Sequence, residues 1–271
     1  MFVEARPDEL FTQEDRFGED EVPYNLFYLI ADLPGSRAVR SLDHRMFYAQ
    51  SSNGVPWLWL DRNVPDAEKP EMIRQLIHFV DDDGLKGICS GPDSAALFSA
   101  LYGERYGVRK QRSMSMEAYA CRELQAPKRV EGSIRPAVLD DQMTIARFLA
   151  DFSEDGYGRS VDAKAQLEAA EGLIQKGGLH VWEVEGRVLS MAQIAHRSPR
   201  HGRINAVFTE RSERGKGYAA AIVADLCRML MKESLMPMLY ADLVNPSSNR
   251  LYRKIGFVPS GRIDDIRFSS V

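Results

Sequence analysis

The chain has 271 residues, of which 44% are hydrophobic and 27% are charged, as in ordinary soluble globular proteins. This length suits one large or two modest domains, no apolar run is long enough to span a bilayer, and a net charge of −4 gives no electrostatic case for nucleic acid. The N-terminal stretch lacks the layout of a signal peptide. Cys89, Cys121 and Cys227 are widely spaced, so we expect a cytoplasmic protein with free thiols and no metal motif.

A boundary between two domains is predicted near residue 130. Residues 123–133 are polar, include Pro127 and Gly132, and separate two regions of apolar periodicity. Residues 1–131 carry 16 basic and 22 acidic side chains, a net −6, whereas residues 132–271 carry 19 and 17, a net +2. We therefore predict an accessory domain over 1–130 and a ligand-binding domain over 131–271. The excess of positive charge in the second would suit a phosphate-bearing ligand, although ordinary variation between domains explains it equally well.

Residue spacing predicts the elements of the first half in chain order. They are a hairpin over 46–61, a helix over 70–84, a strand over 85–90, a helix over 91–107 and a strand region over 109–122. Trp57 and Trp59 alternate with leucines, which favours a strand packed on both faces over a ligand platform.

The second half is predicted to begin with antiparallel strands and to continue as alternating strands and helices. The expected elements are a strand at 133–138, helices at 139–155 and 162–178, a hairpin at 179–198 turning at Glu185–Gly186, a strand at 203–209, a helix at 218–235, a strand at 236–244, a helix at 246–256 opened by Pro246, and strands at 257–261 and 262–270. This order predicts a mixed α/β (α+β) fold.

One stretch of the first half echoes the second. Residues 92–98, PDSAALF, align with residues 246–252, PSSNRLY: proline, serine and leucine coincide, and phenylalanine replaces tyrosine. Each stretch follows a short apolar strand. The echo suggests an internal duplication in which the first copy is non-catalytic, and chance similarity of two strand–helix junctions is the alternative.

Residues 213–220, ERGKGYAA, place two glycines and two basic residues at the front of a helix expected to begin near Gly215. Glycine costs about 1 kcal/mol relative to alanine within a helix, so helix stability does not explain them. The first N–H groups of a helix have no partner within it and attract anions. Gly215 and Gly217 leave those groups open, while Arg214 and Lys216 add positive charge. The segment predicts a phosphate cradle rather than a plain turn.

Two other phosphate-binding patterns fit less well. The P-loop pattern G-x-x-x-x-G-K-[ST] is absent. The dinucleotide fingerprint G-x-G-x-x-G/A is matched by residues 215–220, with Asp242 ending the next strand as a ribose-binding acid. Only 29 residues follow Asp242, too few to complete a doubly wound sheet, and a helix–hairpin order precedes the segment. A dinucleotide-dependent enzyme is therefore the less favoured interpretation.

Residues 203–227 and 239–261 resemble the acyl-CoA-binding core of the GNAT superfamily of N-acetyltransferases. The family's first signature, [QR]-x-x-G-x-[GA] between a strand and a long helix, falls on residues 212–217, with Ser212 replacing the leading Gln or Arg. The second signature, N-x-x-S-N-x-x-Y-x-x-x-G-F, is matched by Asn245, Ser248, Asn249, Tyr252, Gly256 and Phe257. The resemblance covers residues 132–271. It implies a mixed, mostly antiparallel central sheet flanked by helices. If the echo described above is a duplication, the first half is a degenerate copy of this fold.

The resemblance implies acetyl-CoA as co-substrate, with no metal. The strand ending at Thr209 would bind the pantetheine arm, N–H groups of residues 214–219 would bind the pyrophosphate, and an N–H near Val207 would stabilise an oxyanion. Tyr252 would be the general acid that protonates the departing sulfur. The implied cofactor-binding residues are Val207, Phe208, Thr209, Arg214, Gly215, Lys216, Gly217, Tyr218, Ala219, Asn245, Asn249 and Tyr252.

The implied reaction is direct attack by a primary amine on the thioester in a ternary complex. Glu183, Glu210 and Asp242 are candidate bases, and Glu185 and His196 lie on or beside the same strands; the sequence does not choose among them. We expect a small-molecule or peptide acceptor, no nucleic-acid or membrane partner, and a monomer or homodimer. The alternatives are a non-catalytic acyl-CoA sensor or interaction protein, and the dinucleotide-dependent enzyme above.

Overall fold

The computed structural model describes residues 1–5 and 16–270, so part of the N-terminal stretch lies outside the described residues. The chain folds into two compact units. The N-terminal unit comprises Met1–Tyr119, Tyr240–Pro246 and Pro259–Val271, and the C-terminal unit comprises Ala120–Leu239 and Ser247–Val258. Because the chain returns to the N-terminal unit near its end, a single boundary at residue 130 does not describe the two units.

The N-terminal unit has a sheet with strand order β1-β2-β3-β4-β5-β12-β6, covered on both faces. Leu58 belongs to a core cluster with residues of α2 and α3, whereas Trp57 and Trp59 belong to a second cluster with residues of α1. The strand predicted to pack on both faces is therefore confirmed. The elements are β1 (Phe2–Glu4), α1 (Leu26–Asp32), β2 (Arg37–Ser41), β3 (Met46–Gln50), β4 (Trp57–Leu60), α2 (Lys69–Val80), β5 (Gly87–Ser90), α3 (Pro92–Tyr106), β6 (Arg109–Ala120) and β12 (Val258–Ser269), with a short 3-10 turn η2 (Arg16–Glu19).

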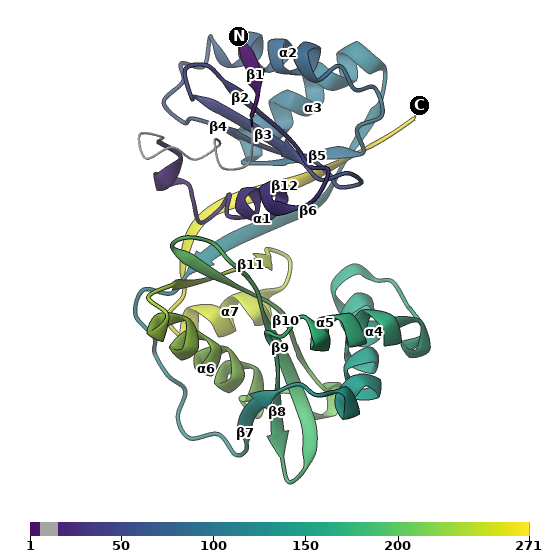
Figure 1. Ribbon diagram of the computed structural model, residues 1–271, viewed down its shortest axis with the longest axis vertical. Helices are drawn as coiled ribbons and strands as arrows, with labels where there is room; N and C mark the ends of the chain where they lie inside the picture. The colour runs from purple at the N-terminus through teal and green to yellow at the C-terminus, as the bar shows by residue number, and fades with distance from the viewer. Residues whose placement is uncertain (6–15, 271) are drawn as a thin grey trace. The chain divides into compact units, whose positions relative to one another are not determined.

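The C-terminal unit has strand order β11-β10-β9-β8-β7. Helices α4 and α5 bury Ile145, Phe148 and Ala170 against β8, β9 and β10, and α6 packs against β9 and β10 from the other side (Figure 1). The elements are β7 (Ser133–Pro136), α4 (Gln142–Tyr157), α5 (Leu167–Gln175), β8 (Leu179–Val184), β9 (Arg187–Arg197), β10 (His201–Thr209), α6 (Tyr218–Lys232), β11 (Met236–Asp242) and α7 (Pro246–Lys254), with 3-10 turns η3 (Leu139–Asp141), η4 (Ala163–Gln166) and η5 (Arg211–Glu213).

The predicted mixed, mostly antiparallel fold is confirmed. Among the described strand pairs, β4–β5 and β10–β11 are parallel, and the others with a recorded register are antiparallel. A doubly wound dinucleotide-binding sheet is instead built from parallel strands. The fold therefore contradicts the dinucleotide interpretation of residues 215–220.

The two halves of the sequence repeat one order of elements, which supports the predicted duplication. Each half has a first strand, one or two helices, three antiparallel strands, a helix, a strand parallel to the preceding one, a second helix, and a last strand. The two aligned prolines, Pro92 and Pro246, are the first residues of α3 and α7. The repeat differs at its end, because β12 lies in the sheet of the N-terminal unit, between β5 and β6.

Several element boundaries differ from the prediction. Helix α6 begins at Tyr218, not near Gly215, and α2 ends at Val80 rather than at residue 84. The helix expected over 162–178 is a 3-10 turn followed by α5, and the two strands expected after residue 256 are one strand, β12. The hairpin turn at Glu185–Gly186 is confirmed, and both residues have the positive φ of a two-residue hairpin loop.

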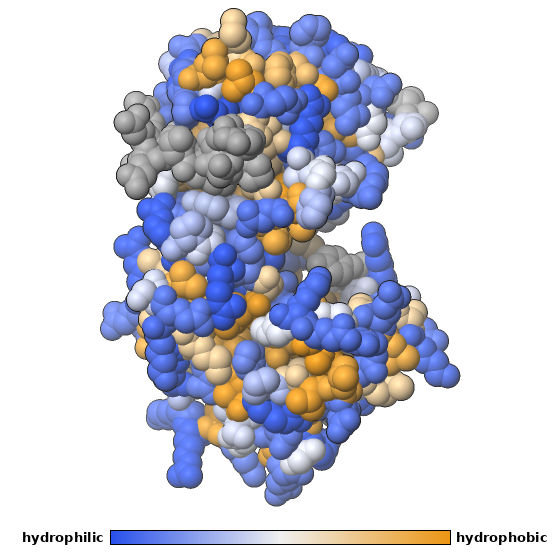
Figure 2. All heavy atoms as spheres, viewed as in Figure 1, coloured by the Kyte–Doolittle hydropathy of each residue, from blue (hydrophilic) through white to orange (hydrophobic). Residues whose placement is uncertain are grey.

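The exposed surface is largely polar on the face shown in Figure 2, where hydrophobic residues occur in scattered groups. A search of the described residues finds no helix with the length and hydropathy of a membrane span.

Candidate cofactor site at the start of helix α6

Strand β10 pairs in parallel with β11 at its beginning. The described register pairs His201, Gly202 and Arg203 with residues 236–238, and no later residue of β10 has a recorded partner in β11. On its other side β10 pairs with β9, but the register gains one residue between Asn205 and Phe208. Ala206, within this bulge, has a φ of +49°, which is rare for a residue other than glycine. The last part of β10 therefore offers backbone N–H and C=O groups to an extended ligand.

The loop after β10 presents free backbone donors. In the described residues, the N–H groups of residues 214–220 have no hydrogen-bond acceptor within the protein. Gly215 and Gly217 have φ angles of +84° and +94°, and Gly217 caps α6 without a side-chain hydrogen bond. A Cβ on Gly215 would meet nothing within 4 Å, so this glycine is needed for its left-handed backbone and the site in front of it is open. Together with the dipole of α6, these N–H groups are suited to bind an anion.

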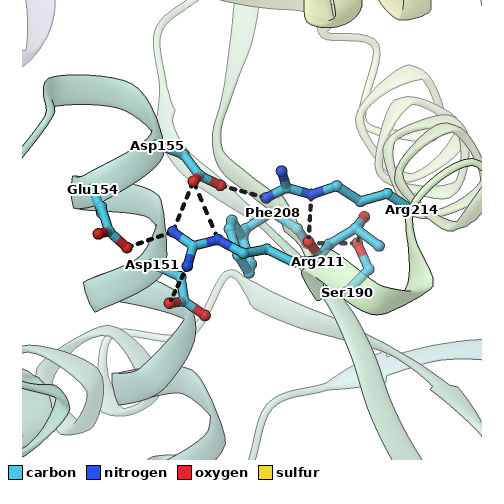
Figure 3. Close-up of polar contacts among 8 residues, drawn as sticks. Asp151, Glu154, Asp155, Ser190, Phe208, Arg211 and Arg214 are labelled. Carbon is cyan, nitrogen blue, oxygen red and sulfur yellow. Dashed lines mark hydrogen bonds and ion pairs between the residues drawn. The ribbon is translucent and has the colours of Figure 1, made fainter.

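The two basic side chains of the loop are already paired. Lys216 Nζ donates to Glu213 Oε2 at 2.6 Å, and Arg214 donates to Asp155 of α4 (Figure 3). The hydrogen bond from Lys216 lowers the pKa of the Glu213 carboxyl, so this carboxylate is ionised at neutral pH. The attraction for an anion therefore comes mainly from the backbone N–H groups and less from Arg214 and Lys216 than the sequence pattern predicted.

The second signature forms the end of helix α7. The Phe257 N–H donates to the Tyr252 carbonyl at 3.0 Å, and the Gly256 N–H donates to the Arg253 carbonyl at 3.2 Å. Gly256 has a φ of +102°, and the rings of Tyr252 and Phe257 meet edge to face with centroids 5.9 Å apart. These are the two hydrogen bonds and the hydrophobic contact of a Schellman cap. The spacing Y-x-x-x-G-F thus has a structural basis that is independent of catalysis.

Tyr252 and Asn249 both lie within the C-terminal unit and are 7% and 8% exposed. Burial raises the pKa of the Tyr252 phenol above its ordinary value of about 10. The phenol is therefore protonated throughout the neutral pH range, as a proton donor must be. Asn245 and Asp242 belong to the segment Tyr240–Pro246 of the N-terminal unit, and their predicted roles stay predictions.

Two of the candidate bases form ion pairs. Glu183 accepts from Arg135 Nε at 2.6 Å, and the same guanidinium is held by Asp141 at 2.7 and 2.9 Å. Glu210 Oε1 lies 3.3 Å from Arg147 Nη1. The Asp242 carboxylate accepts from the Val244 N–H at 3.0 Å. The structure therefore does not single out a base.

The N-terminal half has no counterpart of the cradle or of the phenol. The segment between β4 and α2, residues 61–68, contains no glycine and carries three acidic residues, Asp61, Asp66 and Glu68. Phe98 occupies the position aligned with Tyr252 and stacks on Tyr102 with ring centroids 5.9 Å apart. No group of three or more potential metal ligands occurs in the described part of either unit.

Two features of the site were missed at the sequence level. The bulge at Ala206 has no sequence signal, because alanine does not favour a positive φ. The carboxylates that pair with the arginines of the loop did have a sequence signal. Asp151, Glu154 and Asp155 are spaced i, i+3, i+4 near the end of a predicted helix, which places three like charges on one face.

Fold and loop together define an α/β domain with a row of free backbone N–H groups after a bulged strand, and comparison with known proteins agrees with the fold. Residues 144–257 match the model of the acetyltransferase (GNAT) family. Residues 144–257 therefore form a GNAT acetyltransferase domain, and a domain of this family implies an acyl-CoA donor.

Solved structures show a similar fold over 84–99% of the chain. A GCN5-related N-acetyltransferase from Sphaerobacter thermophilus is 13% identical, with 99% of this chain and 95% of that chain covered and a TM-score of 0.63. A GNAT-family acetyltransferase from Colwellia psychrerythraea is 12% identical, with 99% and 100% covered and a TM-score of 0.59. A GCN5-related N-acetyltransferase from Kribbella flavida is 14% identical, with 84% and 88% covered and a TM-score of 0.51. No curated protein matches the chain.

Proposed function

We propose that the C-terminal unit is an N-acetyltransferase that moves an acetyl group from acetyl-CoA to a primary amine. The observation that carries the proposal is the row of unpaired N–H groups at residues 214–220, one 3-10 turn after the bulged end of β10. The loop suits the pyrophosphate of CoA, and the strand edge suits the amide groups of its pantetheine arm. A free phosphate or a nucleotide would use the first feature and would leave the second unused.

Different residues of the unit would act in different steps of the acetyl transfer. Bound acetyl-CoA supplies the thioester that the amine attacks. An N–H group near Val207, beside the bulge, would stabilise the negative charge that develops on the carbonyl oxygen. Tyr252 would donate its proton to the departing sulfur, so that CoA leaves as a thiol, and the amine would lose its own proton to a base or to water.

The first test is ligand-dependent thermal stability. A ligand at 100 times its Kd adds about 2.7 kcal/mol to the free energy of unfolding, so acetyl-CoA and CoA should raise Tm by several degrees, whereas NADH should not. Stabilisation by NADH without stabilisation by acetyl-CoA would refute the proposal.

A non-catalytic acyl-CoA-binding protein is the second candidate function. The ion pairs of Glu183 and Glu210 favour it, because a carboxylate held by an arginine is less free to contact an amine. Thiol release from acetyl-CoA across a panel of primary amines distinguishes the candidates. We expect thiol release that depends on the amine. If no amine in a chemically broad panel causes release, the non-catalytic function is favoured.

Changing Gly215 to alanine tests the cradle. A left-handed backbone costs roughly 1–2 kcal/mol for a residue with a Cβ, and the loop can relieve this strain by turning its N–H groups away from the anion. We expect the Kd for CoA, measured by calorimetry, to rise about tenfold. Gly177→Ala is the control, since Gly177 also has a positive φ of +67° and open space around its Cβ position. An equal change in Kd in both variants would contradict the prediction.

A further inference from the structure

Helix α4 ends with a set of charges that its own geometry disfavours. Asp151, Glu154 and Asp155 share one face of the helix within its last two turns. The C-terminal end of a helix carries negative partial charge, so carboxylates are unfavourable there, and no basic residue lies in the last turn of α4. Such a locally unfavourable set indicates that compensation comes from elsewhere in the fold.

The compensation comes from two arginines of the segment between β10 and α6 (Figure 3). Arg211 Nη2 donates to Glu154 Oε2 at 2.6 Å and to Asp155 Oδ1 at 2.8 Å, and Nη1 lies 3.5 Å from Asp151 Oδ1. Arg214 Nη2 donates to the other oxygen of Asp155, Oδ2. Asp155 is therefore the carboxylate that joins both arginines, with one oxygen for each.

Arg214 is held at two further points. Its Nε donates to the Thr209 carbonyl at 3.2 Å, and its guanidinium carbon lies 5.2 Å from the centroid of the Phe208 ring. Phe208 is 4% exposed and packs on Phe148 of α4, with ring centroids 5.2 Å apart. Because Arg214 directly precedes Gly215, these contacts fix where the chain enters the glycine loop.

The charges of this cluster persist at neutral pH. Partial burial raises the pKa of the Asp155 carboxyl, but hydrogen bonds from Arg214 and Arg211 outweigh burial and hold it below its ordinary value. Hydrogen bonds to Glu154 and Asp155 likewise raise the pKa of Arg211. The link between α4 and the loop is therefore present throughout the neutral pH range.

We propose that Asp155 is a positioning residue for the cofactor loop: by bonding Arg211 and Arg214 together, it holds residues 211–217 in the shape in which their N–H groups can bind a pyrophosphate. This inference rests on the proposed function. A loop held in its binding shape before the ligand arrives loses less freedom on binding, which strengthens affinity. Arg214 then contributes through its anchorage to α4 as well as through its charge.

The test compares a ligand with a pyrophosphate and one without. Asp155→Asn should raise the Kd for CoA, measured by calorimetry, by roughly fivefold to tenfold, as expected for the loss of two partly exposed ion pairs. The Kd for pantetheine, measured by competition, should stay within twofold because pantetheine has no pyrophosphate. An unchanged or lower Kd for CoA, or an equal loss for both ligands, would overturn the inference.

Matched variants separate positioning from a general effect on folding. Glu154→Gln removes the same charge from the same turn, but Glu154 bonds Arg211 alone, so its effect on CoA should be less than twofold. Asp155→Glu should restore part of the affinity. If Asp155 acts through Arg214, then Asp155→Asn should have little further effect in an Arg214→Gln background, and a fully additive double variant would contradict this route.

The wild-type protein keeps the two proposals apart. Failure of the wild type to bind CoA would refute the proposed function. Binding of CoA by the wild type and equally well by Asp155→Asn would refute only the role of Asp155.

Discussion

Replacing Tyr252 with phenylalanine should lower kcat by about 10²-fold or more and leave the Kd for CoA within threefold. A positioned general acid contributes roughly 10²- to 10⁴-fold, and the substitution removes only the hydroxyl. The ring contact with Phe257, which belongs to the cap of α7, is retained, so Tm should change little. The rate is measured as thiol release with the best amine of the panel, and the Kd by calorimetry.

Tyr48→Phe is the matched control. Tyr48 is also buried and donates its hydroxyl to Gln50 at 2.7 Å, but it belongs to the N-terminal unit and to no proposed site. Loss of the Tyr48 hydroxyl should lower the free energy of unfolding slightly and leave kcat unchanged. If Tyr252→Phe keeps the wild-type kcat, its role is confined to the helix cap and the general acid must be sought elsewhere.

The raised pKa of Tyr252 has a consequence for the pH profile. The protonated phenol is the active form, and burial raises its pKa above the ordinary value of about 10. Ionisation of Tyr252 should therefore cause no loss of kcat between pH 7 and about pH 10. Any rise of kcat with pH in this range would instead report deprotonation of the amine or of its base.

Replacing Gly256 with alanine should destabilise the C-terminal unit by about 3 kcal/mol or more. Two costs combine: Gly256 has a φ of +102°, and a Cβ there would lie 2.1 Å from the Glu123 carbonyl oxygen and 3.1 Å from the Gln125 nitrogen. Both contacts are with backbone, which cannot move aside as a side-chain end can. At roughly 2–4 °C per kcal/mol, Tm should fall by about 6–12 °C.

Gly158→Ala separates the two costs. Gly158 ends α4 with a φ of +63°, and a Cβ there would meet no atom within 4 Å, so only the backbone term applies. We expect a loss of about 1 kcal/mol, in line with a left-handed backbone for a non-glycine residue, measured by urea unfolding of both variants. Equal losses at Gly158 and Gly256 would show that the contact with Glu123 carries no cost.

Sequence alone determined those features that depend on residues close together in the chain. The sequence correctly predicted that α4 and α6 are helices, that the chain turns at Glu185–Gly186, and that Pro246 opens α7. Both signatures of the acetyltransferase family are also local, because a glycine loop and a helix cap are each built within a few residues. The family and the class of donor could therefore be inferred without a structure.

Tertiary structure decided the features that join residues far apart in the chain. Arg214 reaches Asp155, 59 positions earlier, instead of remaining a free charge at the phosphate loop. The clash expected at Gly256 comes from Glu123, and β12 pairs with β5 of the first half. Ala206 adopts a positive φ within a bulge of β10 in its pairing with β9, and no local preference of alanine predicts it. Local sequence sets backbone preferences and helix ends, whereas pairing and packing between distant segments set the shape of the site.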